Sequence, residues 1–287
     1  FRSRRASAPF TGRAHARDRA VAAQAAGVIE RSRLLQESVA KMQMEHELQL
    51  AREVQSRMLP SRPPQIPGLD IHAINIPSKQ VSGDFYDYIV MPQGRTGIAI
   101  ADSVGKSIPA AILTASVRSA LKAQAQNIFR IGQVVGRVNR MLCEDSLPSE
   151  FVTLFYGVID SVTHRMAYCN AGHPPPYLIQ GAGGEVQEEP LSGRGIALGV
   201  VPDPGWEHTI LNVPRGGLLL LYTDGVPDAL GPTGERFGVA RMVDLLRELA
   251  GRPAGEVEER LLGELQQFAG SLPQFDDITI VAVRREA

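Results

Sequence analysis

Residues 97–106 read GIAIADSVGK, an apolar run that ends at Asp102 and passes into a short segment rich in small residues. A second apolar run, Leu218–Tyr222, is followed by Thr223 and then by Asp224. Short, continuous apolar runs bounded by turn-forming residues predict buried strands. The two runs therefore predict two core strands, each of which is followed closely by an aspartate.

The rest of the chain shows many more short strands and two blocks of paired helices. The expected strands are Ile71–Ile76, Phe85–Val90, Gly97–Ala101, Phe151–Asp160, Arg165–Ala171, Pro176–Gln180, Gly217–Tyr222 and Ile278–Val283. The expected helices are Ile108–Asn127, Ile131–Glu144, Val239–Ala250 and Ala254–Phe268. Many strands interrupted by helices in pairs favour an α+β domain in which helices flank a β-sandwich.

The composition excludes several classes of protein. Of the 287 residues, 44% are hydrophobic and 21% are charged, which is typical of a globular chain rather than a disordered one. The formal net charge of −1 gives no general attraction to nucleic acid or to a membrane surface. No apolar run approaches the length of about 20 residues that spans a bilayer, and the amino terminus lacks the basic-then-apolar pattern of a signal peptide. Two cysteines without metal-ligand spacing favour a reducing cytoplasm. We therefore expect a cytoplasmic protein that binds neither nucleic acid nor membrane.

The amino-terminal segment differs from the rest. From about Arg17 to Leu59 there is no proline, and apolar residues recur at three- and four-residue steps, as in a helix with a coiled-coil character. This stripe favours a parallel homodimer, although a single helix lying on its own domain is an alternative. Four prolines then form a stiff linker over residues 60–68. We expect a dimerising segment at 1–59 and a globular domain at 69–287.

Aspartates lie at the ends of several predicted strands. Asp84 precedes one strand, Asp102 and Asp224 follow two others, and the pair Asp276-Asp277 precedes the last. Carboxylates crowded at one edge of a core repel one another and need cations for neutralisation. Oxygen ligands without a Cys/His set favour Mg²⁺ or Mn²⁺ over Zn²⁺. A lone Asp beside Gly is more often a turn former than a ligand, so the residues alone leave both interpretations open.

Six short segments resemble, in order, those of a known family. They are VSGDFYD at 81–87, ADSVGKSIPAA at 101–111, FVTL at 151–154, NAGHPP at 170–175, YTDGV at 222–226 and DDIT at 276–279. This set is similar to the bacterial phosphatases of the stage II sporulation protein E and RsbU type, within the type-2C (PPM) serine/threonine phosphatase superfamily. The similarity extends from about Leu48 to the end of the chain.

The resemblance implies a PPM-type αββα sandwich that holds two Mn²⁺ or Mg²⁺ ions and removes phosphate from phosphoserine or phosphothreonine by metal-activated water. It implies that Asp84, Asp102 and Asp224 are catalytic and hold the metals, with the backbone carbonyl of Ser103 as a possible further ligand. The fourth carboxylate is Asp276 or Asp277, and the motif prefers the first. His173 is interpreted as structural rather than as a proton donor, and Lys79 and Lys106 are candidates for binding the phosphate.

The resemblance also implies a partner and a means of regulation. The expected substrate is a phosphorylated regulatory protein of the anti-sigma-factor antagonist type. Residues 22–35 are similar to the closing helix of a GAF sensor domain, and residues 47–60 to a linker helix that precedes such phosphatases. The start at Phe1 suggests that a sensor domain has been cut away. Regulation through this helix is therefore expected, and a catalytically weak or inactive module that binds a phosphoprotein is the alternative.

Overall fold

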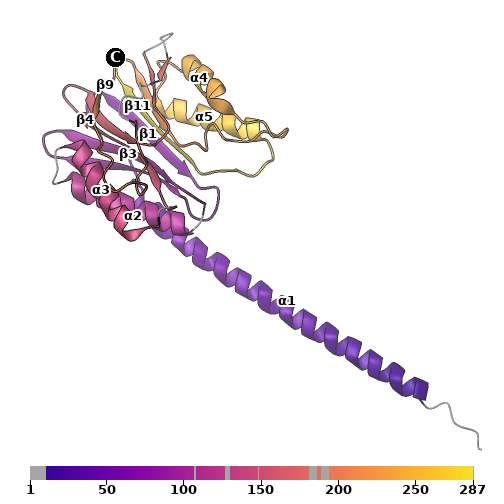
Figure 1. Cartoon of the computed structure of the whole chain (residues 1–287). Helices are drawn as coiled ribbons and strands as arrows, with labels where there is room; N and C mark the ends of the chain where they lie inside the picture. The colour runs from indigo at the N-terminus through magenta and orange to yellow at the C-terminus, as the bar shows by residue number, and fades with distance from the viewer. Residues whose placement is uncertain are drawn as a thin grey trace, which may run out of the picture. The chain divides into compact units, whose positions relative to one another are not determined.

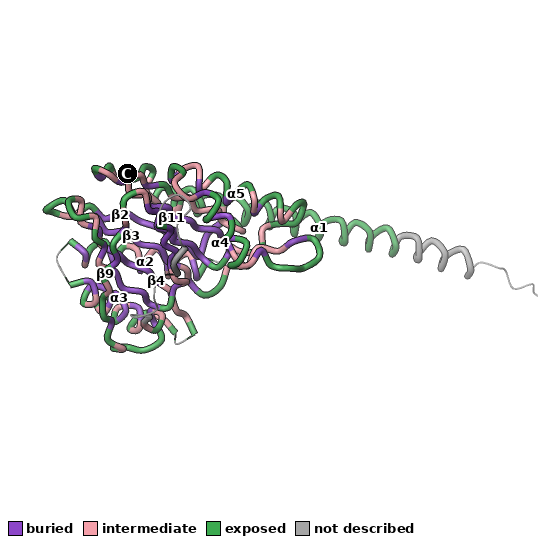
Figure 2. The backbone as a smooth tube through the Cα atoms, turned by 90° about the horizontal axis from the view of Figure 1, so that it is seen from above, coloured by how far each residue is buried: buried purple, intermediate pink, exposed green. Residues whose placement is uncertain are grey.

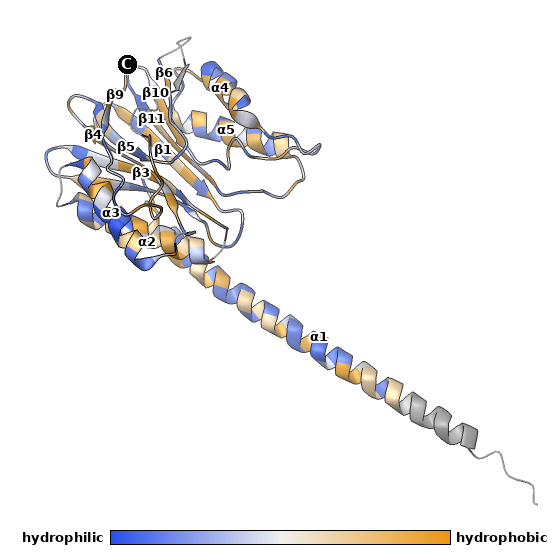
Figure 3. Ribbon diagram, viewed as in Figure 1, coloured by the Kyte–Doolittle hydropathy of each residue, from blue (hydrophilic) through white to orange (hydrophobic). Residues whose placement is uncertain are grey.

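The computed structural model describes residues 11–106, 108–126, 130–147, 149–180, 186–188 and 194–286. The chain forms two units, one up to Leu50 and one from Ala51 onward. Helix α1 spans Thr11–Met58, which confirms the long helix expected from the sequence. Apolar residues recur along the coloured part of the helix (Figure 3), and Leu35, Val39 and Met42 are exposed. None of the described helices combines the length and apolar character that crossing a bilayer requires.

Two β-sheets form the centre of the second unit (Figure 1). The first sheet has the strand order β1-β11-β10-β6-β7. Its strands are β1 (Leu69–Ile76), β6 (Tyr177–Ile179), β7 (Val186–Glu188), β10 (Leu218–Tyr222) and β11 (Ile278–Arg285). The second sheet has the order β2-β3-β4-β5-β8, with β9 also paired to β5. Its strands are β2 (Asp84–Met91), β3 (Arg95–Ser103), β4 (Val152–Asp160), β5 (Arg165–Ala171), β8 (Arg194–Gly195) and β9 (Thr209–Asn212).

The inner faces of the two sheets pack against each other. Ile98 and Ile100 of β3 contribute to this layer from the second sheet, and Leu219 and Leu221 of β10 contribute from the first. All four side chains are almost fully buried, and buried backbone fills the centre of the molecule in Figure 2. Because successive side chains of a strand point to opposite faces, the residues between them point outward toward the helices.

Two pairs of helices cover the outer faces. Helices α2 (Ile108–Ala125) and α3 (Ile131–Asp145) pack on Ala99 and Ala101 of β3. Helices α4 (Gly238–Glu248) and α5 (Ala254–Ala269) pack on Leu218 and Leu220 of β10. The central strands are therefore buried on both faces, which explains why their sequences are continuous apolar runs rather than alternating ones. The expected α+β sandwich with flanking helices is confirmed (Figure 1).

Candidate active site

The predicted aspartates lie where strands of both sheets end. In the β2–β3 ladder, Asp84 is the partner of Asp102, so the two residues lie side by side in neighbouring strands. In the other sheet, the backbone N–H of Thr223 donates to the carbonyl of Thr279 (3.0 Å), which joins the end of β10 to the start of β11. Asp224 directly follows the first of these threonines. One edge of the sandwich thus receives carboxylates from both sheets.

Asp84 is the most deeply buried of these groups. It is 2% exposed, and its Oδ2 accepts hydrogen bonds from the hydroxyls of Thr223 and Thr279, both at 2.7 Å. The threonines belong to the first sheet and Asp84 to the second, so these bonds connect the two layers at the site. Burial raises the pKa of Asp84 well above its usual value, and the charge of Asp102 raises it further.

The charges of the cluster act on one another. Burial, together with the charges of Asp224, Asp276 and Asp277, raises the pKa of Asp102 to about 7. Partial burial and the charge of Asp276 also raise the pKa of Asp224. The free energy of placing these carboxylates together is therefore unfavourable while they are ionised, and cations or protons relieve it.

Asp276 and Asp277 have different surroundings. Asp277 is buried, and its carboxylate accepts from the N–H (2.6 Å) and hydroxyl (2.8 Å) of Ser78, the Ser82 hydroxyl (3.0 Å) and the Gly83 N–H (2.6 Å). Asp276 instead forms an ion pair with Lys106 at 2.7 Å. Asp277 therefore holds the loop in front of Asp84, whereas Asp276 is paired with the ammonium group of a lysine side chain.

Two further residues named from the sequence, Ser103 and His173, lie at or near this edge. Ser103 is buried, and its N–H donates to the carbonyl of Gly83 at 3.2 Å, which places the backbone after Asp102 beside the Gly83 loop. His173 is buried next to Thr153, with 2.9 Å between its Nδ1 and the threonine hydroxyl. Burial lowers its pKa to about 3, so the ring is neutral near pH 7.

Asp87 lies outside the cluster although it belongs to the same strand as Asp84. A separation of three residues puts the two side chains on opposite faces of β2. Asp87 points toward α2, where it pairs with Arg118 at 2.9 Å. This ion pair therefore joins α2 to the sheet, and the carboxylate of Asp87 is not part of the cluster.

The donor atoms of the cluster suit a hard divalent cation. All are carboxylate or backbone oxygens, the ligands that Mg²⁺ and Mn²⁺ prefer. Within the described part of the chain, however, no group of three or more Asp, Glu, His or Cys side chains is arranged to hold one ion. The contacts give the reason, because Asp84 faces two threonine hydroxyls and Asp276 faces Lys106. Metal binding thus remains a prediction.

The sequence did not reveal the residues that hold the cluster in place. The side-chain amide of Gln55, near the end of α1, donates to the Ser82 carbonyl (2.7 Å) and accepts from the Ser82 N–H (2.8 Å). The hydroxyl of Thr114 in α2 donates to the Gly83 carbonyl at 3.0 Å. The only available signal was the adjacency of the Ser82-Gly83 segment to Asp84, because hydrogen bonds between distant segments leave no spacing pattern.

Comparison with known proteins identifies the family. A model of the family described as stage II sporulation protein E (SpoIIE) matches residues 92–286. The chain belongs to the SpoIIE family. It is 28% identical to the phosphoserine phosphatase RsbU of Bacillus subtilis (strain 168) over 249 residues, which cover 86% of this chain and 72% of RsbU. It is 29% identical over 247 residues to the phosphoserine phosphatase RsbP of the same organism, covering 85% of this chain and 59% of RsbP.

The structure agrees with this assignment. The SiaA-PP2C domain of Pseudomonas aeruginosa superimposes with a TM-score of 0.75 and 26% identity, over 86% of this chain and 99% of that domain. This SpoIIE-family chain is a protein serine/threonine phosphatase. The family and the enzyme class predicted from the sequence are thereby confirmed, and the GAF-like interpretation of residues 22–35 remains a prediction.

The raised pKa of Asp102 predicts a pH dependence of stability in the metal-free protein. A carboxyl group that titrates near 3.8 when unfolded and near 7 when folded binds its proton more tightly in the folded state. Its contribution to the free energy of unfolding is therefore largest at low pH and is lost as the pH rises from about 4 to about 7. Thermal unfolding in EDTA across this window is the measurement. The Tm of the wild type should fall relative to that of Asp102→Asn as the pH rises, and parallel curves would contradict the assignment.

Proposed function

We propose that this phosphatase requires divalent cations and hydrolyses phosphoserine or phosphothreonine on a regulatory protein of the anti-sigma-factor antagonist type. The observation that carries the proposal is the buried Asp84 beside the partly buried Asp102, since the pKa values of both are raised by burial and by neighbouring carboxylates. Such repulsion is costly to maintain in a folded protein. A cation-binding role explains why the fold keeps these groups together.

Some residues of the site would bind the cations, and others would hold the metal-binding carboxylates in position. Asp84, Asp102, Asp224 and Asp276 would bind two ions, Mn²⁺ or Mg²⁺, together with the carbonyl of Ser103. When bound, such ions supply positive charge to the phosphoryl oxygens and lower the pKa of water. The four hydrogen bonds to Asp277 support a positioning role for that residue.

The remaining residues at the site orient the carboxylates or neutralise their charge. The hydroxyls of Thr223 and Thr279 fix one oxygen of Asp84, which leaves its other oxygen free of these two bonds. Lys106 brings an ammonium group to Asp276, and on release from Asp276 it is available to a phosphate oxygen. His173 stays neutral in the core and is not offered as a proton donor. No side-chain nucleophile is needed for direct attack by water.

Substitution of single carboxylates tests this division of roles. Asp102→Asn and Asp276→Asn should each lower Mn²⁺-dependent release of phosphate from a phosphopeptide by about a hundredfold or more, because each removes a charge that the cations need. Isothermal titration with Mn²⁺ should show the same loss. Asp277→Asn should instead lower the Tm, because buried donors lose their acceptor.

Asp244→Asn, on the exposed face of α4, serves as the control and should change neither property. If Asp102→Asn kept an activity near that of the wild type, this result would contradict the proposed mechanism. An inactive wild type that still binds Mn²⁺ would favour a phosphoprotein-binding module instead.

We further propose that α1 regulates the site through its last turns. Gln55 holds both backbone groups of Ser82, two residues before Asp84. An open apolar groove of about 540 Å³ lies between this end of α1 and α2, lined on the two sides by residues such as Val54, Met58 and Ile112, of which the first and last are more than half exposed. A helix end that is held by hydrogen bonds and only partly covered on its apolar side is suited to a two-state movement. A shift of the helix end would move Ser82 and, with it, the start of β2.

Substitution of Gln55, which makes both hydrogen bonds to the Ser82 backbone, is the direct test. Gln55→Ala should raise the Mn²⁺ concentration for half-maximal activity several-fold, by loss of preorganisation at Asp84, while activity at saturating Mn²⁺ changes less. The matched control is Gln49→Ala, an exposed glutamine of the same helix. Identical metal dependence in the two variants would show that Gln55 has no part in assembling the site.

Dimer formation through α1 is proposed from its exposed apolar stripe. Leu35, Val39 and Met42 repeat at the spacing of a helix–helix seam and are about half exposed. Leu48→Pro interrupts the helix and should shift the chain from dimer to monomer in analytical ultracentrifugation. A wild type that sediments as a monomer, or a variant that remains dimeric with full activity, would contradict this proposal.

A further inference from the structure

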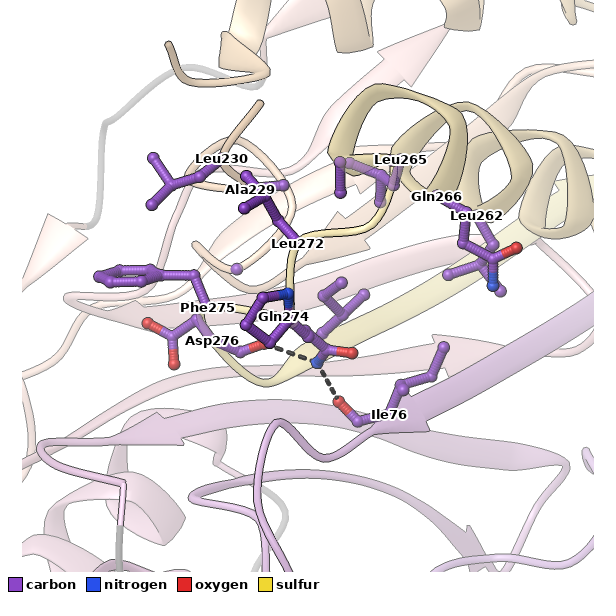
Figure 4. A pocket seen from close by; sticks show the side chains of 15 residues that line it. Ile76, Ala229, Leu230, Leu262, Leu265, Gln266, Leu272, Gln274, Phe275 and Asp276 are labelled. Atoms are coloured by element: carbon purple, nitrogen blue, oxygen red, sulfur yellow. Dashed lines mark hydrogen bonds between the residues drawn. The ribbon is translucent and has the colours of Figure 1, made fainter. Parts of the chain in front are cut away.

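An open apolar cavity of about 170 Å³ lies beside the carboxylate cluster (Figure 4). Its walls come from α5, from the loop after β10 and from the loop between α5 and β11. The apolar residues that matter here are Ala229, Leu230, Leu262, Leu265, Leu272 and Phe275. A cavity of about 150 Å³ with similar walls is large enough to bind benzene. The space therefore matches one apolar side chain of the size of Leu, Ile or Phe.

The lip of the cavity exposes apolar side chains to solvent. Leu272 is 40% exposed and Phe275 is 52% exposed, although both lie at the mouth of an apolar space. A concave apolar surface with exposed apolar residues at its rim is the usual form of a binding site. An acidic side chain would lose its hydration there and would lie near the carboxylate of Asp276, which also lines the cavity, and both effects select against it.

The lip is firmly tied to the cluster. The side-chain amide of Gln274 donates to the carbonyls of Ile76 (2.8 Å) and Asp276 (2.6 Å), as the dashed lines in Figure 4 show. Lys106 donates to the Phe275 carbonyl at 2.9 Å, and its ammonium lies 4.0 Å from the centre of the Phe275 ring. The segment that borders the cavity is therefore held in place by bonds to the site itself.

The cavity and the cluster also share residues. Asp276 lines the cavity and belongs to the cluster, and Gly225, which also lines it, directly follows Asp224. A phosphorylated residue at the carboxylates therefore lies close to the mouth of the cavity, within reach of the side chains that flank it. This continuity favours part of the substrate over a separate ligand as the occupant.

We propose that this cavity binds an apolar side chain of the phosphoprotein substrate, close in sequence to the phosphorylated residue, and so sets local sequence preference. The inference rests on the proposed function of the neighbouring cluster. It adds a specificity site, formed by α5 and its two adjacent loops, to the metal-dependent chemistry.

Phosphoserine peptides provide the test. In an alanine background, a leucine is placed at each position flanking the phosphoserine in turn, and kcat/KM is measured with the full chain and Mn²⁺. One position should give a preference for leucine over alanine of about tenfold or more, which is typical of a single apolar pocket. Aspartate at that position should remove the gain. Equal rates at every position would overturn the proposal.

Two cavity variants make the test specific. Ala229→Leu fills the space and should abolish the leucine preference, whereas Leu262→Ala enlarges it and should move the preference toward phenylalanine or tryptophan. Gln267→Leu, at an exposed position of α5, is the control and should keep the wild-type preference. A preference that survives in both cavity variants, with their Tm values confirming that they fold, would also overturn the proposal.

Hydrolysis of para-nitrophenyl phosphate separates this inference from the function on which it rests. This small substrate has no flanking residues and reports only the chemistry at the cluster. Wild-type protein that does not hydrolyse it with Mn²⁺ would contradict the proposed metal-dependent function. Protein that hydrolyses it but shows no peptide preference would contradict only the proposal that the cavity binds a substrate side chain. Cavity variants that change sedimentation and leave the preference intact would identify a second copy of the chain as the occupant.

Discussion

Burying Asp84 beside Asp102 places a carboxyl group where water cannot screen its charge well, and the neighbouring charge of Asp102 disfavours its ionisation further. Antiparallel pairing of β2 and β3 makes this unavoidable, since it fixes the two residues as cross-strand partners. The hydroxyls of Thr223 and Thr279 stabilise one carboxylate but add no positive charge. The negative charge of the site therefore exceeds its positive charge, and the surrounding hydrogen bonds must hold the carboxylates together against their repulsion.

The same constraint explains why the supporting contacts come from so many parts of the chain. Ser82 and Gly83, which precede Asp84, are bonded to Asp277, to Gln55 of α1 and to Thr114 of α2. Carboxylates that repel one another move apart unless their backbones are held, so each of these bonds opposes the repulsion. A consequence is that helices on the outside of the sandwich share hydrogen bonds with the segment that carries a central carboxylate.

The sequence predicted most of the fold because its central strands are buried on both faces. The runs at Gly97–Ala101 and Leu218–Tyr222 need only hydrophobicity to be recognised. Strand β9 was missed because it is short and only one of its four residues, Leu211, is buried. The choice between Asp276 and Asp277 could not be made either. Adjacent residues at a strand end point to opposite sides, and only the structure shows which side faces Ser78 and which faces Lys106.

Lys106 contacts both the carboxylate cluster and the lip of the apolar cavity. Its ammonium neutralises Asp276, while its bond to the Phe275 carbonyl and its position on the Phe275 ring hold the lip of the apolar cavity. A cation that bound Asp276 under the proposed function would therefore compete with the same ammonium group that contacts Phe275. The proposed metal site and the proposed side-chain cavity thus share a single loop, residues 272–276.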